Sequence, residues 1–414
     1  MKKELPMLVL MFFCLIFSAS HAGALLAGTA SDKINPPDGT YLGGYDHNRK
    51  STGIHDDLRA RAVVFDDGKT AMALVVLDAL SIQDFITAEI QKKAAEKAGN
   101  PRLSPENIIV QVTHTHCAPD LTGLYGASPA ESGLSMEYVS FLSETASALV
   151  AKAWTGRREA SLSWAETTCA GWVANDSEPG NLDSRVTILK ADGTEGGTLF
   201  TLTNFPAHPT VLDGDNTLVS ADWVGGFYAG MSEKSPGEHV YLQGAIGAWI
   251  QPVTPERTFT LAEKYGRDLA EKVLEAIRHT TPVKGTEVRV KSKQFRMPLQ
   301  NETFSQMTEL KLTPRVMGGG AVETSVAWFS VGEAQFATHP GETAPIYAAQ
   351  TRELMKTGPK FVLGLGMDHL GYIVPVDYFD HTGNYKYADY LVGMSPGREA
   401  GPSMMKALGE IIPH

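Results

Sequence analysis

Two histidines directly follow an apolar run in the sequence. Residues 107–112 are rich in β-branched side chains and are followed by Thr113, His114, Thr115 and His116, which predicts a buried strand with two imidazoles at its end. Because side chains alternate along a strand, we expect His114 and His116 to share a face. Two such imidazoles can bind a cation such as zinc, or one can bind metal while the other transfers protons. A hydrogen-bonded histidine pair without a ligand is the alternative, and the pair alone does not decide.

Further polar side chains occur just past the ends of other apolar, β-rich segments. They are His208 after residues 198–203, Glu342 after residues 335–338, and Tyr372 after residues 361–365. In α/β proteins, sites form in short loops at strand ends, because the sheet fixes both ends of each loop. Each residue also has a structural explanation, as a loop histidine, a helix cap and a core tyrosine. Their common position makes them, with His114, candidates for one site.

The order of segments predicts an α/β fold with layered mixed β-sheets flanked by helices. Two β-rich runs, residues 61–66 and 70–77, are joined at Asp67-Gly68, a strong hairpin signal. Helical periodicity occurs at residues 83–98, 136–154, 258–279 and 403–412. Strands and helices that alternate in this way favour an α/β core. No long linker divides the chain, so we expect a single large domain.

The first residues have the composition of a secretory signal. Two lysines precede a nearly all-apolar run over residues 5–19, and a small-residue cleavage site follows at Ala22. This run is shorter than the roughly 20 residues of a spanning helix, and no later segment is predicted to cross a membrane. We therefore expect residues 1–22 to be a signal peptide and residues 23–414 to be exported, to the periplasm or the extracellular space.

The chain is acidic, with 36 Lys and Arg against 47 Asp and Glu and a formal net charge of −11. An acidic chain without a basic run argues against nucleic acid as a partner and against electrostatic docking on anionic lipid. After the predicted signal, the cysteines are Cys117 and Cys169. They could form one disulfide, but two cysteines are no framework, so the fold must depend on its core.

Seven short motifs occur in the order and rough spacing of a known family. They are Gly53-Ile54-His55-Asp56, Ala60-Arg61-Ala62, Thr113-His114-Thr115-His116, Ala207-His208-Pro209, Ser220-Ala221-Asp222, Pro340-Gly341-Glu342 and Gly371-Tyr372-Ile373. Through them the chain resembles the neutral/alkaline (non-lysosomal) ceramidase family, from about residue 27 almost to its end. The resemblance implies that residues 23–414 form a zinc hydrolase domain, without the C-terminal β-sandwich domain of longer ceramidases.

The resemblance also implies a catalytic zinc ion and its ligands. In the family, the residues that match His114, His208, Glu342 and Tyr372 bind the metal. Imidazole and carboxylate are ordinary zinc ligands, whereas a phenolate is rarer. A water on an open zinc position has its pKa lowered from 15.7 to about 7. His339, three residues before Glu342, is an alternative member of such a set.

Three more residues receive roles from the resemblance. His116 matches a histidine that contacts the reacting group, by proton transfer or by a hydrogen bond to the oxyanion. Asp222 is expected to orient a histidine ligand. Tyr385 matches a tyrosine near the substrate, and Tyr390 is close enough to be the alternative.

The expected function is that of a secreted, zinc-dependent amidohydrolase. Its substrate would be the N-acyl amide of ceramide or a related N-acylated lipid, cleaved by metal-activated water, with peripheral contact to a membrane. One alternative is a catalytically inactive relative that binds metal or lipid. A second alternative is a zinc amidase or esterase for a small soluble substrate.

Some residues depart from the family pattern. The family carries a serine before proline, proposed as a nucleophile or substrate anchor, where Gly247 aligns here. Asp176 follows Asn175 where the family tends to have arginine, and Cys117 replaces a serine after the histidine motif. Because a metal-activated water needs no side-chain nucleophile, we expect hydrolysis by water in spite of Gly247.

Overall fold

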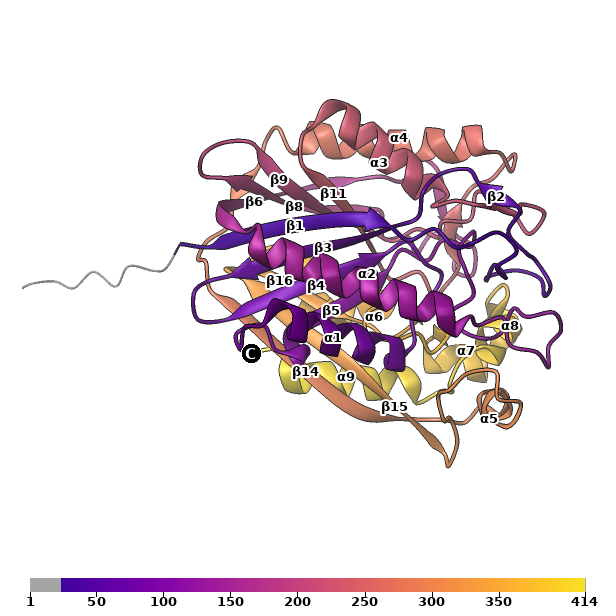
Figure 1. Cartoon of the computed structure of the whole chain (residues 1–414). Coiled ribbons are helices and arrows are strands. Elements are labelled where there is room, and N and C mark those ends of the chain that lie inside the picture. Colours follow the sequence, from indigo (N-terminus) through magenta and orange to yellow (C-terminus); the bar gives the residue numbers. More distant parts are fainter. Residues whose placement is uncertain (1–23, 414) are drawn as a thin grey trace, which may run out of the picture.

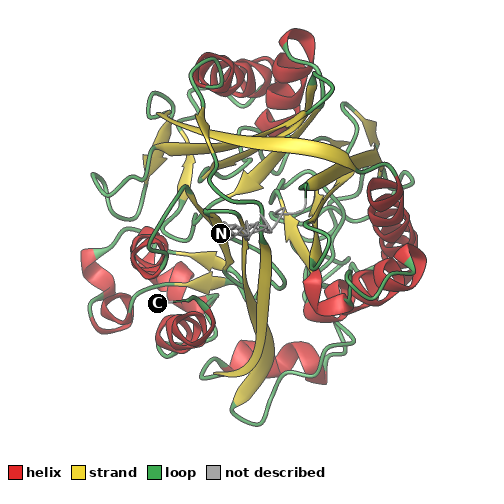
Figure 2. Ribbon diagram, turned by 90° about the vertical axis from the view of Figure 1, so that its left-hand side faces the viewer, coloured by secondary structure: helices red, strands yellow, loops and turns green. Residues whose placement is uncertain are grey.

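Two β-sheets lie face to face at the centre of the structure, a computed structural model that describes residues 24–413. Helices cover the outer faces of both sheets, so that the layers run helix, sheet, sheet, helix (Figure 1, Figure 2). This architecture confirms the predicted α/β fold with layered mixed sheets. The predicted signal peptide, residues 1–22, lies outside the described residues.

The larger sheet contains the strands that lead to His114 and His208. Its strands are β1 (Leu26–Lys33), β3 (Arg59–Asp66), β4 (Ala71–Leu77), β5 (Ile108–Val112), β6 (Arg158–Thr168), β8 (Arg185–Gly193), β9 (Thr198–Phe205), β11 (Glu238–Gln243) and β13 (Thr281–Pro282). Their order is β11-β9-β8-β6-β1-β3-β4-β5, with β13 beside β6. The β4–β5 and β9–β11 pairs are parallel, and the other neighbours are antiparallel, so the sheet is mixed.

The smaller sheet leads to Glu342 and Tyr372. It consists of β14 (Val288–Pro298), β15 (Ala321–Val331), β16 (Ala334–Thr338) and β18 (Lys360–Leu363), in that order, with β16 and β18 parallel. Short strand pairs lie outside the two sheets: β2 (Gly53–Ile54) with β10 (Leu218–Val219), β7 (Val173–Asn175) with β12 (Ile250–Pro252), and β17 (Glu342–Thr343) with β19 (Tyr372–Ile373). The parallel β17–β19 register places Glu342 directly opposite Tyr372.

Helices form the two outer layers and part of the loop end of the molecule. They are α1 (Asp84–Ala98), α2 (Met136–Thr155), α3 (Trp223–Lys234), α4 (Phe259–Ala276), α5 (Glu302–Glu309), α6 (Pro345–Leu354), α7 (Val376–Asp380), α8 (Ala388–Gly393) and α9 (Ala400–Ile411). The helices α1 to α4 pack on the larger sheet, and α6 and α9 pack on the smaller one. Figure 1 shows α5, α7 and α8 together at one end of the molecule.

The alternation of side chains along β3 shows why these strands are buried on both faces. Ala60, Ala62 and Val64 belong to the core beneath the helices, whereas Val63 and Phe65 belong to the core between the sheets. All five are fully buried. Burial of a large apolar side chain contributes roughly 1.5–3 kcal/mol, so both cores stabilise the scaffold that carries the loops.

The two cysteines are both buried and free. The disulfide that Cys117 and Cys169 could form is therefore not made. The stability of the described part of the chain depends on its packed layers, as the cysteine count predicts. In residues 24–413, every helix is too short or too polar to cross a membrane.

The side chain of Gln243, at the end of β11, joins the two segments that carry His114 and His208. The amide nitrogen of Gln243 donates to the carbonyl oxygen of Thr113 at 3.0 Å and to that of Ala207 at 2.9 Å. These residues directly precede His114 and His208. A buried amide with both hydrogens paired is strongly oriented, so Gln243 fixes the two histidine segments relative to each other.

Candidate metal centre

Three imidazoles at the ends of the strands share one mode of attachment. In each ring Nδ1 lies within 3.0 Å of a main-chain carbonyl oxygen, which belongs to Leu80 for His114, to Gly44 for His116 and to Ile250 for His208. A carbonyl oxygen only accepts hydrogen bonds, so each Nδ1 carries the hydrogen. In the neutral ring the lone pair is then on Nε2. The backbone therefore selects the same tautomer three times.

The three Nε2 atoms and one carboxylate oxygen converge on a common point. His114 Nε2 lies 3.3 Å from His116 Nε2, and Glu342 Oε2 lies 2.9 Å from His208 Nε2 and 3.5 Å from His114 Nε2. The three histidine nitrogens lie within 4.8 Å of one another. Lone pairs brought this close repel unless a cation lies among them. Imidazole and carboxylate are also the ligands that zinc accepts, so these residues fit a zinc ion.

The backbone reaches this arrangement differently from the prediction. We expected strand alternation to align His114 and His116, but β5 ends at Val112 and His114 has a φ of 71°. A left-handed conformation is uncommon outside glycine and is found at functional sites. The two rings face the same point because the chain turns sharply after the strand, and their planes are nearly perpendicular.

Glu342 is buried among imidazoles. Burial alone would raise its pKa, but the charge of a protonated His114, and the hydrogen bonds that His114, His208 and His369 donate when protonated, outweigh this and hold the pKa well below the usual range. Its Oε2 faces His114 and His208, and its Oε1 lies 3.2 Å from Nε2 of His369. The carboxylate is thus ionised and is shared between two groups of histidines.

Tyr372 lies beside Glu342 as expected, with its hydroxyl group in a further contact. Nε1 of Trp249 donates to that hydroxyl oxygen at 2.8 Å. Burial, reinforced by the charge of Glu342, raises the pKa of Tyr372 well above its usual value. In the protein alone Tyr372 is therefore a neutral phenol, and it would bind a metal as a phenolate only if the ion displaced its proton.

His116 differs from the other two anchored rings in its electrostatics. Burial and the neighbouring charges of His114 and His208 hold the pKa of His116 well below its usual value. The ring is neutral near pH 7, with its free Nε2 directed at the cluster. That nitrogen can accept a proton or join the ligands, so the geometry includes His116 in the candidate metal centre.

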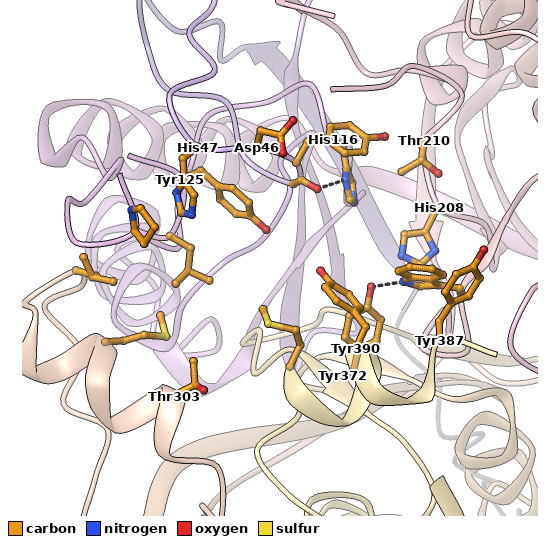
Figure 3. A pocket seen from close by; sticks show the side chains of 18 of the residues that line it. Asp46, His47, His116, Tyr125, His208, Thr210, Thr303, Tyr372, Tyr387 and Tyr390 are labelled. Carbon is orange, nitrogen blue, oxygen red and sulfur yellow. Dashed lines mark hydrogen bonds between the residues drawn. The ribbon is translucent and has the colours of Figure 1, made fainter. Parts of the chain in front are cut away.

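Three residues of the centre, His116, His208 and Tyr372, line an open cavity of about 850 Å³, whereas His114 and Glu342 line a smaller chamber beside it. His116 and His208 lie on one side of the open cavity, and Tyr372, Tyr387 and Tyr390 from the C-terminal segment lie across from them (Figure 3). The other lining residues include apolar side chains and polar ones such as Asp46, Gln251 and Arg257; the apolar ones include Leu124, Met307, Leu310, Leu312 and Met394. A narrower chamber of about 100 Å³ continues past His114 and His369 beneath α5.

Tyr385, the predicted substrate contact, is not among the residues that line the cavity. Its hydroxyl donates to the carboxylate of Asp377 and its ring stacks on Tyr378, with centroids 4.1 Å apart, away from the cavity lining. Tyr390, the alternative, lines the cavity, and its ring centroid lies 6.0 Å from that of Tyr372. The orientation of helix α8 directs Tyr390 toward the cavity, and this orientation cannot be predicted from the sequence.

Asp222 acts on the backbone and not on an imidazole, which corrects the expected contact with a histidine ligand. Its carboxylate accepts hydrogen bonds from the main-chain N–H groups of Val211, Leu212 and Trp223. Burial raises the pKa of Asp222 to about 6, although these N–H groups oppose the change. Its bonds close the loop that follows His208, so it helps to shape the centre without touching it.

Gly247 has no room for a side chain. A Cβ atom there would lie 2.0 Å from the carbonyl oxygen of Glu342, and the N–H of Gly247 donates to the carbonyl oxygen of Thr343 at 2.8 Å. The backbone of this loop thus packs directly on the strand that carries Glu342. The side chain of this segment that reaches the cavity belongs to Trp249, so Gly247 has a packing role.

His339 faces away from the centre, so the alternative ligand pair with Glu342 is not formed. Its Nδ1 and Nε2 pair with the hydroxyl groups of Thr343 and Thr351 at 2.8 and 2.9 Å. Burial, and then the charge of Arg352, lowers the pKa of His339 to about 3. This histidine is a neutral core residue.

Three residues of the centre were not singled out as members by the sequence. Gln243 ends the short strand β11 and Trp249 follows it, neither belongs to a motif, and their contacts depend on tertiary packing. His369 stands three residues before Tyr372. The sequence contained one indication of its role, because a histidine close in sequence to a predicted ligand is a candidate for the same metal site.

The layered fold and this site define a two-sheet α/β protein with a histidine and carboxylate centre at its strand ends. The family profile of neutral/alkaline non-lysosomal ceramidase, N-terminal, matches residues 27–251. This is more than half of the chain, and the chain belongs to that family. The matched residues contain three of the predicted site histidines, His114, His116 and His208.

Similar proteins agree with this assignment. The neutral ceramidase of Mycobacterium tuberculosis is 26% identical over 280 residues, which cover 57% of this chain and 42% of that protein. The crystal structure of the Pseudomonas aeruginosa neutral ceramidase has the same fold, with a TM-score of 0.75 and 16% identity over 94% of this chain and 75% of that one. A second structure, described as ceramidase complexed with C2, gives a TM-score of 0.76, 15% identity and the same coverage of both chains.

Proposed function

We propose that the protein is a zinc-dependent hydrolase that cleaves the N-acyl amide bond of ceramide or a related N-acylated lipid. One observation carries the proposal. Three imidazoles of fixed tautomer and an ionised carboxylate converge where a large cavity meets a narrower chamber. The chain belongs to the ceramidase family, and a catalytic metal ion would have its place at this point.

His114, His208 and Glu342 would hold the ion, with Tyr372 beside them. When bound, zinc lowers the pKa of a coordinated water to about 7 and polarises an amide carbonyl. His116 is neutral and its Nε2 is free, so it accepts a proton from the attacking water and returns it to the leaving amine. Hydrolysis by this route needs no serine, which agrees with the lack of space at Gly247.

The cavity supports a lipid-like substrate. Its volume of about 850 Å³ lies within the range of roughly 300–1,000 Å³ for ligand sites. Leu310 and Tyr390 line the cavity and are about half exposed, and Val316 on the loop after α5 is 79% exposed. We propose that these exposed apolar side chains contact a membrane or micelle surface, and the apolar residues that line the cavity next to Leu310 support this.

Export belongs to the same proposal. It is supported by the residue pattern of positions 1–22, in which a basic start, an apolar run and small residues follow one another. N-terminal sequencing of the protein recovered from the periplasm or medium should begin at residue 23. Recovery of the protein only from the cytoplasm, with Met1 retained, would contradict export.

The test of the activity uses a panel of three fluorescent substrates. These are an N-acyl sphingosine, an N-acyl amino acid of similar acyl length, and the matched acyl ester. The purified protein should release fatty acid from the N-acyl sphingosine fastest, and a zinc chelator should abolish the release. Faster cleavage of the soluble amide or of the ester would favour the second alternative function, and cleavage of none would indicate an inactive relative.

A further inference from the structure

His369 differs from the three anchored histidines in its hydrogen bonds. Its Nε2 lies 3.2 Å from Oε1 of Glu342, whereas its Nδ1 is buried and has no hydrogen-bond partner. No carbonyl group therefore forces the hydrogen onto Nδ1. A carboxylate oxygen only accepts, so the hydrogen of the neutral ring is on Nε2 and is donated to Glu342. His369 thus has the tautomer opposite to that of His114, His116 and His208.

This difference makes His369 a hydrogen-bond donor to Glu342, whereas the anchored histidines can act as metal ligands. The anchored rings present lone pairs toward the centre, but His369 presents an N–H group to the outer oxygen of the carboxylate. Glu342 is thereby divided, with Oε2 near His114 and His208 and Oε1 occupied by His369. A carboxylate with one oxygen engaged in this way is available to a metal through the other oxygen alone.

The segment before His369 is rigid enough to hold the ring in place. Asp368 is fully buried and pairs with both Nη atoms of Arg315 at 2.7 and 2.8 Å, and with the hydroxyl of Thr324 at 2.6 Å. The main-chain N–H of His369 also donates to Asp368 at 2.9 Å. The backbone of His369 is therefore fixed by a buried ion pair, and the ring extends from it to Glu342.

We propose that His369 is a positioning residue that keeps Glu342 a ligand through one oxygen. If Oε1 were free, the carboxylate could rotate or bind through both oxygens, and it would fill the position that a catalytic zinc site keeps open for water. The inference rests on the proposed zinc site, and it adds a residue of this chain that shapes the site without binding the metal.

The test compares His369→Gln with His369→Met. The two side chains are unbranched and of similar size, but only glutamine has an N–H group that can reach Oε1 of Glu342. Each metal-free protein is titrated with zinc against a competing chelator, which gives the affinity and the number of ions bound without any substrate. His381→Met is the control, because His381 pairs with Asp377 in an exposed histidine–carboxylate contact away from the cavity.

We expect His369→Met to bind one zinc with an affinity about 10–100-fold below that of the wild type, the usual effect of losing a partner of a ligand. His369→Gln should stay within about threefold, His381→Met should not change, and circular dichroism should show that all variants are folded. Equal affinities of the Met variant and the wild type would overturn the inference. A second result would also overturn the inference: the wild type binds two zinc ions, and both variants bind one. His369 would then be a metal ligand.

The outcomes also distinguish the inference from the proposed function. A wild-type protein that binds no zinc contradicts both. A wild type that binds zinc and loses affinity on His369→Met, but hydrolyses no substrate, contradicts the proposed activity and leaves the positioning role supported. A wild type that is active and insensitive to His369→Met in the zinc titration contradicts the positioning role alone.

Discussion

Main-chain carbonyl groups, and not carboxylates, hold the three imidazoles of the centre. The oxygen atoms of Leu80 and Gly44 belong to two different loops, and that of Ile250 belongs to the start of β12. At the residue scale, the orientation of each ring therefore depends on the position of the main-chain carbonyl group that it contacts. A substitution of one of these histidines removes an Nε2 lone pair from the centre. A substitution that moves a loop leaves the imidazole intact but displaces its Nε2 atom.

Replacement of His114 should remove the metal. Its Nε2 is the atom within 3.5 Å of both His116 Nε2 and Glu342 Oε2, so His114→Ala opens the centre of the cluster. We expect the zinc content to fall from one equivalent to near zero and the amidase activity with it. The exposed His279, at the end of α4, is the control, and His279→Ala should keep both. Retained zinc in His114→Ala would show that the ligand assignment is wrong.

A serine at position 247 should destabilise the protein and not improve catalysis. Its Cβ would lie 2.0 Å from the Glu342 carbonyl oxygen, and such overpacking costs typically about 1–3 kcal/mol or more. Urea unfolding of Gly247→Ser should show this loss, together with weaker zinc binding because Glu342 moves. Gly383→Ser is the control, since no atom lies within 4 Å of a Cβ there. A stable and more active Gly247→Ser would contradict the packing role.

The single residues of the site differ in how far the sequence could predict them. His114, His208 and Glu342 follow strand ends and belong to motifs, and the fold brings all three to one point. The sequence could not show that Tyr390 and not Tyr385 lines the cavity, because this depends on the rotation of a short helix. The histidine tautomers could not be predicted either, because the carbonyl groups that set them lie far away in sequence.

At the element scale, the ends of β5, β9 and β11 act as one unit through Gln243. Its amide group bonds to the carbonyl groups of Thr113 and Ala207, and its oxygen accepts from Gly244 N and Tyr241 Oη at 3.0 Å. The sequence predicted the strands and their order along the chain. It could not predict this bridge, because hydrogen bonds between strand ends depend on sheet order.

Removal of the Gln243 amide should loosen both histidine segments. Gln243→Met leaves two buried carbonyl groups without their donor, and each such group costs about 1–3 kcal/mol. We expect lower stability in urea unfolding and weaker zinc binding in the same variant. Gln91→Met removes one hydrogen bond, to Ile108 at the opposite end of β5, and should leave zinc affinity unchanged. Equal zinc affinities of the two variants would contradict the bridging role.

The helix α8 places Tyr390 at the cavity where we propose that the substrate binds. Tyr390 lines the cavity, whereas the hydroxyl of Tyr385 is engaged with Asp377 outside it. Tyr390→Ala should lower kcat/KM for an N-acyl lipid about tenfold, or about 1.4 kcal/mol of transition-state stabilisation. Tyr385→Phe should change it less than twofold. A large loss in Tyr385→Phe with a normal Tyr390→Ala would restore the original assignment.

At the scale of the whole molecule, the two-sheet core carries a buried neutral histidine that links stability to pH. The pKa of His339 is about 3 in the folded protein because burial disfavours its charged form, and about 6.5 in an unfolded chain. Between these values the unfolded state binds the additional proton, so this residue makes stability fall as the pH decreases from 6.5 toward 3. The slope is at most about 1.4 kcal/mol per pH unit.

His339→Gln should remove this part of the acid sensitivity. Urea unfolding of the zinc-free wild type and of His339→Gln at pH 7, 5 and 4 measures the difference. The wild type should lose more stability than the variant on acidification, even if the variant is less stable at pH 7. Parallel losses in both proteins would show that His339 titrates normally in the folded state.

The overall architecture was predictable to the level of its layers. The alternation of β-rich runs with helical segments indicated an α/β protein with layers of sheets and helices. The division into two packed sheets was not predictable in detail. It depends on which strands pair, and parallel pairs such as β16 with β18 join segments that are separated by a helix.

We propose that one zinc ion at this cluster makes the protein an N-acyl amide hydrolase. The most direct measurement titrates the metal-free protein with zinc while following hydrolysis of an N-acyl sphingosine. Activity should rise in proportion to zinc and stop rising at one equivalent per chain. Full activity of the metal-free protein, or one equivalent of bound zinc with no hydrolysis, would contradict the account.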